Sequence, residues 1–135
     1  MSSISPVTRG VHHIGLSVSD LQASILFFTR LLNFSIMAEK PAYPAAILSD
    51  TQTMITLWQV EDPDTCTSFD RRKNVGLHHL ALAMENETAL LALYAKLTDA
   101  NITFEFPPEP RADGKAMHMM TLIPGGPRVE FVCPT

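Results

Sequence analysis

The feature of this chain that most constrains its fold is an internal duplication. Shifting the 135-residue sequence by 66 positions places Val11–Val18, which reads VHHIGLSV, on Leu77–Met84, which reads LHHLALAM. The agreement extends well past these two runs, for example to Glu39, which falls on Glu105. A repeat over so much of a chain this short predicts one domain built from two similar halves.

Each doubled histidine stands at the front of an apolar run that alternates like a β-strand. Since successive side chains of a strand point to opposite faces, the first run has a bulky face that includes His12 and a small-residue face headed by His13. The second run divides in the same way, with His78 on the bulky face and His79 heading the small one. The bulky faces are expected to carry a helix, with His12 and His78 as hydrogen-bonded core residues. The small-residue faces leave open space that side chains do not fill.

The rest of each half has the pattern of one helix followed by three strands. In the first half, Ser19 or Asp20 is expected to cap a helix that ends near Asn33, and short strands are expected over 34–40, 45–49 and 54–60. In the second half, Asn86 is expected to cap the helix, and the strands are expected over 102–106, 115–123 and 127–133. The final turn, Pro124-Gly125-Gly126, consists of residues that tolerate tight backbone geometry.

One loop, 107–114, is longer than its counterpart in the first half and breaks the register of the repeat. Apart from this insertion, the halves are the same unit. The predicted fold class is therefore α+β, with two tandem βαβββ modules at about 9–60 and 75–133. A polar linker at about 61–74 joins them.

Composition narrows the functional classes. The net charge of −4 does not suit a nucleic-acid partner, and the one basic cluster, 71–73, lies in the expected linker. Cys66 and Cys133 have neither the number nor the spacing of a disulfide framework or a zinc knuckle. No run has the apolar length of a signal peptide or a membrane span, so a cytoplasmic protein with no membrane partner is expected.

The same alternation selects candidate metal ligands. Val129 and Phe131 belong to the apolar face of the last strand, which leaves Glu130 pointing the other way. If the strands curl into a cup whose wall is the small-residue face, then His13, His79 and Glu130 project into it. Two imidazoles and a carboxylate suit one divalent ion such as Zn²⁺, Ni²⁺, Mn²⁺ or Fe²⁺.

Three further residues are candidates for the same cup. Thr56 occupies the fourth symmetric place, and because a threonine hydroxyl is a poor ligand, the ion would keep positions open for water or substrate. Trp58 shares a face with Thr56 and is expected either to wall the substrate pocket or to fill the core. His118 alternates with Met120 and is a candidate general acid or base.

Three segments together resemble the vicinal oxygen chelate superfamily, which includes glyoxalase I, methylmalonyl-CoA epimerase, extradiol dioxygenases, fosfomycin-resistance enzymes and bleomycin-binding proteins. They read HHIGLSVSDLQASILFFTRLLNF, GLHHLALAM and IPGGPRVEF. The resemblance implies a glyoxalase-like fold, an open barrel-like mixed sheet with a central cup that holds a metal ion. It also implies a small substrate that presents two vicinal oxygens to that ion. His13, His79 and Glu130 match the family's ligand positions, whereas glyoxalase I and the epimerase carry Glu or Gln in place of Thr56.

The function that this resemblance favours is a metal-dependent glyoxalase-family enzyme of the lyase or isomerase type that stabilises an enolate, with Glu130 or His118 as the base. Three alternatives stay open: a non-catalytic drug-binding protein similar to bleomycin-resistance proteins, an Fe-dependent extradiol-type dioxygenase, and a fosfomycin-modifying transferase. The resemblance also implies a homodimer. The ligands then meet either within one chain or between two.

Overall fold

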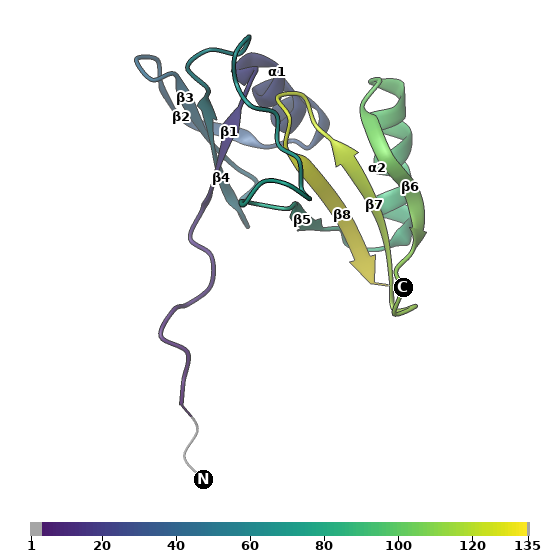
Figure 1. Ribbon diagram of the computed structural model, residues 1–135. Coiled ribbons are helices and arrows are strands. Elements are labelled where there is room, and N and C mark those ends of the chain that lie inside the picture. Colours follow the sequence, from purple (N-terminus) through teal and green to yellow (C-terminus); the bar gives the residue numbers. More distant parts are fainter. Residues whose placement is uncertain (1–3, 135) are drawn as a thin grey trace.

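The computed structural model describes residues 4–134, and its elements repeat in order along the chain (Figure 1). The first half contains β1 (Ile14–Val18), α1 (Leu21–Leu26), the π-helical segment η1 (Phe27–Leu31), β2 (Ser35–Lys40), β3 (Ala45–Ser49) and β4 (Met54–Gln59). The second half contains β5 (Leu80–Ala83), α2 (Glu87–Asp99), β6 (Thr103–Pro110), β7 (Ala116–Leu122) and β8 (Arg128–Pro134).

The two halves form two four-stranded sheets with the same strand order. The order is β1-β4-β3-β2 in the first sheet and β5-β8-β7-β6 in the second. In each sheet the first and last strands of the half pair in parallel and the remaining neighbours are antiparallel. This topology confirms the prediction of an α+β chain with two tandem βαβββ modules. Over the described part of the chain, the two sheets are separate and do not close into a barrel.

Side-chain caps start both helices where the sequence predicts them. Asp20 accepts a hydrogen bond from the backbone N–H of Ala23, and Asn86 accepts one from Ala89. These bonds satisfy backbone donors that have no partner inside the first helical turn. The cap of the first helix is therefore Asp20 rather than Ser19.

The first helix does not keep a regular α-helical form to its end, as the sequence pattern suggested. After Leu26 the backbone widens into η1. The change places Phe27 and Phe28 side by side in the core, both almost fully buried, with their rings in a T-shaped contact at 5.3 Å. A π-helical turn shifts the helical periodicity, which explains how two consecutive side chains are both buried.

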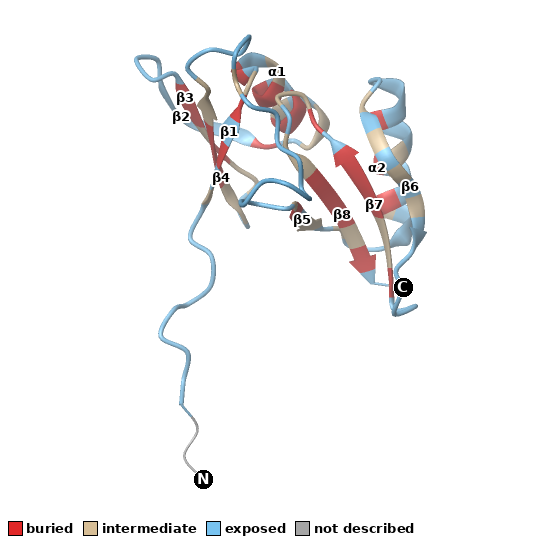
Figure 2. Cartoon of the chain, in the orientation of Figure 1, coloured by how far each residue is buried: buried red, intermediate tan, exposed pale blue. Residues whose placement is uncertain are grey.

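One hydrophobic core runs through both modules and lies between the sheets and the helices (Figure 2). In β1, Leu16 and Val18 are buried on the helix side, whereas Gly15 and Ser17 are exposed on the other. This confirms the predicted division of the strand into a bulky and a small-residue face. The open face of each sheet carries the small residues.

The prediction for the first histidine of each pair was wrong. His12 and His78 are both exposed and do not belong to the core. The reason is that β1 begins only at Ile14 and β5 only at Leu80, so the doubled histidines precede the strands. Strand alternation therefore does not apply to them.

The predicted loop at 107–114 is also shorter than expected, because β6 continues to Pro110. β6 is the outer strand of its sheet, where a proline need not donate to a neighbouring strand. Its pairing with β7 shifts register between Phe104 and Phe106 and again between Phe106 and Glu109. Each of these shifts inserts one extra residue into β6.

The turn between β7 and β8 connects the two modules. The hydroxyl of Ser24, which is fully buried in α1, donates to the carbonyl of Pro124 at 2.8 Å, and the N–H of Ser19 donates to the carbonyl of Gly125 at 3.0 Å. Gly125 has a φ of +95°, and a Cβ at this position would lie 2.2 Å from the Ser24 hydroxyl oxygen. Glycine is thus required here both by backbone conformation and by close approach.

No helix in residues 4–134 is long and apolar enough to cross a membrane.

Candidate metal centre

The strand register places Glu130 and Thr56 at equivalent positions of the two sheets. Glu130 pairs with Ala81 of β5, and Thr56 pairs with Gly15 of β1. Both lie on the open face, one residue away from fully buried side chains of the core. The symmetric place that the duplication predicts for Thr56, opposite Glu130, is therefore present in the fold.

Glu130 is the centre of a compact cluster on the second sheet. Its residue is only 9% exposed. His79 Nε2 lies 3.3 Å from Glu130 Oε1, and His118 Nδ1 lies 2.5 Å from Glu130 Oε2. A buried carboxylate is costly without partners, and here each oxygen faces an imidazole nitrogen.

His118 reaches this cluster from β7, as the alternation of that strand predicts. It pairs with Val132 of β8, and its ring packs on Phe106 with the centroids 4.7 Å apart. On the outer side, His118 Nε2 lies 3.8 Å from Glu109 Oε1, and the Glu109 side chain is half exposed. His118 therefore connects the buried Glu130 to a carboxylate at the surface.

His13 lies apart from this cluster. Its side chain is exposed ahead of β1, and its Nδ1 is 2.9 Å from Nδ1 of His12. Of the residues that the structure describes, no three His, Cys, Asp or Glu side chains are arranged to hold a metal ion within one chain. The structure thus brings together His79, Glu130 and His118, and leaves His13 separate.

The open face of the first sheet carries an aromatic cluster around Thr56. The Thr56 hydroxyl accepts a hydrogen bond from Trp58 Nε1 at 2.8 Å. The Trp58 ring makes a T-shaped contact with Tyr43 at 4.7 Å, and Lys40 Nζ lies 5.2 Å from the centroid of the same ring. Tyr43 and Lys40 were not identified from the sequence, although Tyr43 lies between two of the predicted strands, 34–40 and 45–49. Trp58 is partly exposed and lies on the open face rather than in the core.

A second group missed by sequence reasoning supports the segment that carries His79. Arg128 forms a two-pronged ion pair with Glu105, with Nε–Oε1 and Nη2–Oε2 distances of 2.7 Å. Its Nη1 donates to the backbone carbonyl of His78 at 2.7 Å and to Nδ1 of the same residue at 3.0 Å. Arg71 of the linker adds a weaker contact to Glu105 at 3.3 Å. Strand alternation alone predicts only that Arg128 lies on the same face as Glu130.

The charges in this group shift three pKa values. The hydrogen bonds from Arg128 lower the pKa of Glu105, and the same bonds raise the pKa of Arg128. Desolvation, followed by the positive charge of Arg128, lowers the pKa of His78. His78 is therefore held in its neutral form at neutral pH.

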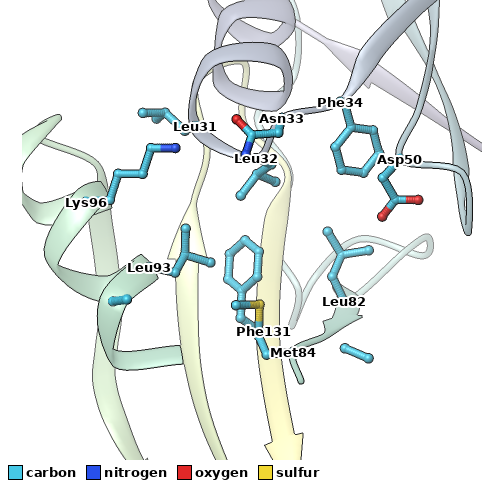
Figure 3. Close-up of a pocket in the computed structure, with 12 residues that line it drawn as sticks. Leu31, Leu32, Asn33, Phe34, Asp50, Leu82, Met84, Leu93, Lys96 and Phe131 are labelled. Carbon is cyan, nitrogen blue, oxygen red and sulfur yellow. The ribbon is translucent and has the colours of Figure 1, made fainter. Parts of the chain in front are cut away.

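Two hollows lie near these groups. One of about 520 Å³ is bounded by the small-residue face of β1, the linker and the start of β8, and its wall includes Gly15, Ser17, Phe69, Leu77 and Arg128. The room predicted beside the small residues is thus present. The other, of about 340 Å³, lies between η1 and α2 and is lined by apolar side chains together with Asn33, Asp50 and Lys96 (Figure 3). It contacts Phe131, whose side chain points away from Glu130, so the sheet separates this second hollow from the histidine cluster.

The distance between His79 and Glu130 fits two ligands of one divalent ion. With bonds of about 2.1 Å and a tetrahedral angle, two ligand atoms are separated by about 3.4 Å. The separation between His79 Nε2 and Glu130 Oε1 is 3.3 Å. Nitrogen and carboxylate oxygen are also the donor types that such ions bind.

Two βαβββ modules with the same strand order, each with small residues on its open face, define the class of paired-module α+β proteins. Within this class the chain belongs to the Glyoxalase/Bleomycin resistance protein/Dioxygenase superfamily, whose family model matches residues 10–131.

Part of the chain is also similar to a curated protein. The chain is 29% identical over 92 residues to the cadmium-induced protein CadI of Mycobacterium tuberculosis. The match covers 68% of this chain and 54% of CadI, so the chain spans about half the length of the curated relatives that it matches.

Solved structures share the fold along nearly the whole chain. A glyoxylase/bleomycin resistance protein/dioxygenase domain from Frankia sp. EAN1pec has a TM-score of 0.82 at 22% identity, covering 95% of this chain and 93% of that one. A lactoylglutathione lyase from Agrobacterium tumefaciens has a TM-score of 0.71 at 15% identity, covering 95% and 96%. A mutant fosfomycin resistance protein FosX from Listeria monocytogenes, complexed with Mn(II) and dihydroxypropylphosphonic acid, has a TM-score of 0.75 at 16% identity, covering 96% and 95%.

Proposed function

We propose that this protein is a metal-dependent enzyme of the lyase or isomerase type that binds a small substrate through two vicinal oxygens. The observation that carries the proposal is the buried carboxylate of Glu130, with His79 at 3.3 Å from one oxygen and His118 at 2.5 Å from the other. The packing of a hydrophobic core does not require a carboxylate between two imidazoles. Binding a metal ion and accepting a proton do require such a group.

His79, Glu130 and His13 are the residues that would hold the ion. A divalent ion bound there supplies a Lewis acid for negative charge that develops on the substrate oxygens. Thr56, in the fourth place, has its hydroxyl engaged by Trp58, so it adds no ligand and leaves room for substrate.

The ligand set is completed by a second copy of the chain in this proposal. His13 lies apart from Glu130 within one chain, and it is exposed and accessible to another copy. The outer edge of β1 and that of β5 both lack a neighbouring strand among residues 4–134. A homodimer that apposes these edges would give each ion His79 and Glu130 from one protomer and the partner's His13.

Glu130 and His118 would handle the proton that leaves the substrate. Because His118 holds Glu130 Oε2, a proton taken by this pair has a route outward through His118 Nε2 toward Glu109. The base is then the pair, rather than Glu130 or His118 alone.

Fosfomycin modification is the second candidate. The proposed site has three protein ligands and no acidic fourth one at Thr56, and Lys40 next to Trp58 offers a cation on the open face to an anionic substrate. The likeness to the FosX complex, which contains Mn(II) and a phosphonic acid, supports this alternative. Turnover assays with fosfomycin and with hemithioacetals of glutathione separate the two candidates.

The metal content of two variants tests the proposal. We expect His79→Ala and Glu130→Gln to lose bound metal and turnover while retaining the fold, because each removes one of three protein ligands. Glu39→Gln, a change of an exposed carboxylate on β2, is the matched control and should bind metal like the wild type. Elemental analysis that finds the same metal content in His79→Ala and in the wild type would refute the site.

A further inference from the structure

We propose that Trp58 of β4, Tyr43 of the β2–β3 turn and Lys40 at the end of β2 form a recognition platform for a planar aromatic anion on the open face of the first sheet. The platform would hold the part of the substrate that does not bind the ion. The inference thus names the class of substrate, and in that respect it rests on the proposed function. The platform itself is built from the first module alone, so its binding to such an anion is measurable without a metal ion.

The Trp58 ring is fixed in place by its neighbours. Its Nε1 donates to the hydroxyl of Thr56 at 2.8 Å, and Thr56 is only 6% exposed. A Cβ at Gly15, the residue opposite Thr56 on β1, would lie 3.2 Å from that hydroxyl oxygen and 3.3 Å from Trp58 Nε1. Both separations are tighter than ordinary contacts, so glycine at position 15 gives the indole its room. A ring that is already ordered costs little entropy to immobilise when a ligand binds.

The platform presents an aromatic surface and a cation to solvent. Tyr43 is 61% exposed and contacts the partly exposed Trp58 in a T-shaped arrangement at 4.7 Å. The ammonium of Lys40 lies over the indole, 5.2 Å from its centroid. Within residues 4–134, no carboxylate oxygen lies within 4.0 Å of this ammonium. A flat ligand can therefore contact the two rings while a negative group on it pairs with the lysine.

The equivalent places of the second module carry different side chains. Trp58 pairs with Ala45 on β3, whereas the corresponding pair of the second sheet is Val132 with His118. The pair in the second sheet contributes the histidine next to Glu130, and the pair in the first contributes aromatic surface. This difference supports separate tasks for the two open faces, with recognition on the first sheet and chemistry on the second.

Space for a ligand is present beside the platform. The hollow of about 520 Å³ is walled in part by Gly15 and Ser17, which are the neighbours of Thr56 and Trp58 across the β1–β4 pairing. Its volume lies in the range of about 300 to 1,000 Å³ that is typical of small-molecule sites. A ligand in this hollow can reach the edge of the indole.

The direct test uses the indole N–H of Trp58, which is the only tryptophan of the chain and gives one signal in a ¹H–¹⁵N correlation spectrum. The full chain, without added metal, is titrated with three matched probes. These are phenylglyoxylate, its aliphatic counterpart pyruvate, and its neutral aromatic counterpart 1-phenylpropane-1,2-dione. We expect the Kd of phenylglyoxylate to be about 3- to 10-fold lower than that of pyruvate. It should be about 2- to 5-fold lower than that of the dione.

Two results of this titration would overturn the inference. One is equal Kd values for phenylglyoxylate and pyruvate. The other is an indole signal that does not respond to phenylglyoxylate. If that unresponsive signal instead shifts with protein concentration, the platform is covered by a second copy of the chain and is not a ligand site.

Two pairs of variants assign the parts of the platform. Lys40→Gln should abolish the preference for phenylglyoxylate over the dione, whereas Lys96→Gln, a change of an exposed lysine on α2, is the control and should keep it. Tyr43→Leu should weaken phenylglyoxylate binding by about 2- to 5-fold, and Tyr43→Phe, which keeps the ring, should bind like the wild type. A retained preference in Lys40→Gln, or an unchanged Kd in Tyr43→Leu, would contradict the assigned roles.

His79→Ala separates this inference from the proposed function. The change leaves the platform intact, so the metal-free variant and the metal-free wild type should bind phenylglyoxylate with the same Kd. Loss of bound metal together with retained phenylglyoxylate binding is the result that both proposals predict. Retained metal in this variant would refute the proposed site, whereas a wild type that does not bind phenylglyoxylate would refute the platform.

Discussion

At the scale of single residues, the carboxylate of Glu130 and the ring of His118 form the closest contact in the candidate site. The 2.5 Å separation joins an acid of β8 to a histidine of the neighbouring strand β7. Neither group reaches the hydrophobic core, because both lie on the open face of the second sheet. Their contact therefore belongs to the candidate site and is not part of the packing of the hydrophobic core.

Replacing His118 tests its part in proton transfer. We expect His118→Phe to retain metal but to lose turnover by about 10²- to 10⁴-fold, because Glu130 Oε2 loses its partner and the route to Glu109 is removed. The measurement is kcat as a function of pH, in which one limb of the wild-type profile should disappear. A variant with unchanged kcat and an unchanged profile would remove His118 from the mechanism.

Single residues also show what the sequence predicted and what it did not. The orientation of Glu130 follows from the buried Val129 and Phe131 on either side, because strand alternation is strict inside β8. The same rule of strand alternation failed for His78, because this residue precedes β5. Tyr43 could not be predicted because its contact with Trp58 depends on the path of a loop.

At the scale of elements, helix caps and turns contribute to the stability of the modules. For α2 we expect Asn86→Ala to lower the free energy of unfolding by about 1 kcal/mol, because the N–H of Ala89 loses its acceptor. This corresponds to a fall in the melting temperature of roughly 4 °C, measured by circular dichroism. Thr88→Ala, an exposed change in the same turn, is the control and should melt within about a degree of the wild type. An equal effect of both changes would contradict the assigned cap.

The turn between β7 and β8 allows a matched comparison of two glycines. Gly125 and Gly126 both have a positive φ, but only Gly125 would place a Cβ against Ser24, whereas a Cβ at Gly126 meets nothing within 4 Å. Alanine at either position strains the backbone, and at Gly125 it adds a clash. We expect Gly125→Ala to be less stable than Gly126→Ala by about 1 to 3 kcal/mol in urea denaturation. Equal stabilities would show that the contact with Ser24 does not hold the modules together.

The elements themselves were largely predictable, because their periodicity and caps are local signals. The two departures have physical causes that lie outside any short window of sequence. The change to η1 buries two consecutive phenylalanines, and β6 extends to Pro110 because it is the outer strand of its sheet.

At the scale of the whole molecule, one ion-pair group connects the linker, β6 and β8 through Arg71, Glu105 and Arg128. Since the pKa of Glu105 is lowered in the folded protein, its contribution to stability is present above its ordinary value of 4.5. The contribution is lost as the pH falls through the lowered value. We expect the stability difference between the wild type and Glu105→Gln, from urea denaturation, to be constant near neutral pH and to shrink below about pH 4.5. A difference that does not change with pH would contradict the role of this charge.

The proposed assembly makes a prediction that no single chain can satisfy. His13→Ala and His79→Ala each lack one ligand of the proposed site. A mixed dimer regains one complete site, in which His79 comes from the His13→Ala chain and His13 comes from the His79→Ala chain. After joint refolding we expect about a quarter of the wild-type metal content, because half of the dimers are mixed and each has one intact site. Refolding each variant alone is the control. No recovery in the mixture would place the whole ligand set within one chain.

The repeat and its two βαβββ modules could be predicted for the whole molecule because the two halves have similar sequences. The distance between His13 and Glu130 could not, because it depends on how the two sheets are placed, and the single chain leaves them unjoined.

The central claim is that His79, Glu130 and the partner's His13 bind one divalent ion, and anomalous X-ray scattering from crystals of the native protein tests it most directly. We expect one peak per candidate site, at about 2.0 to 2.2 Å from His79 Nε2 and from a Glu130 oxygen, with a His13 nitrogen of the neighbouring protomer as the third ligand. Crystals grown with Zn²⁺ or Mn²⁺ that show no peak at Glu130, or a peak bound only by other residues, would contradict it.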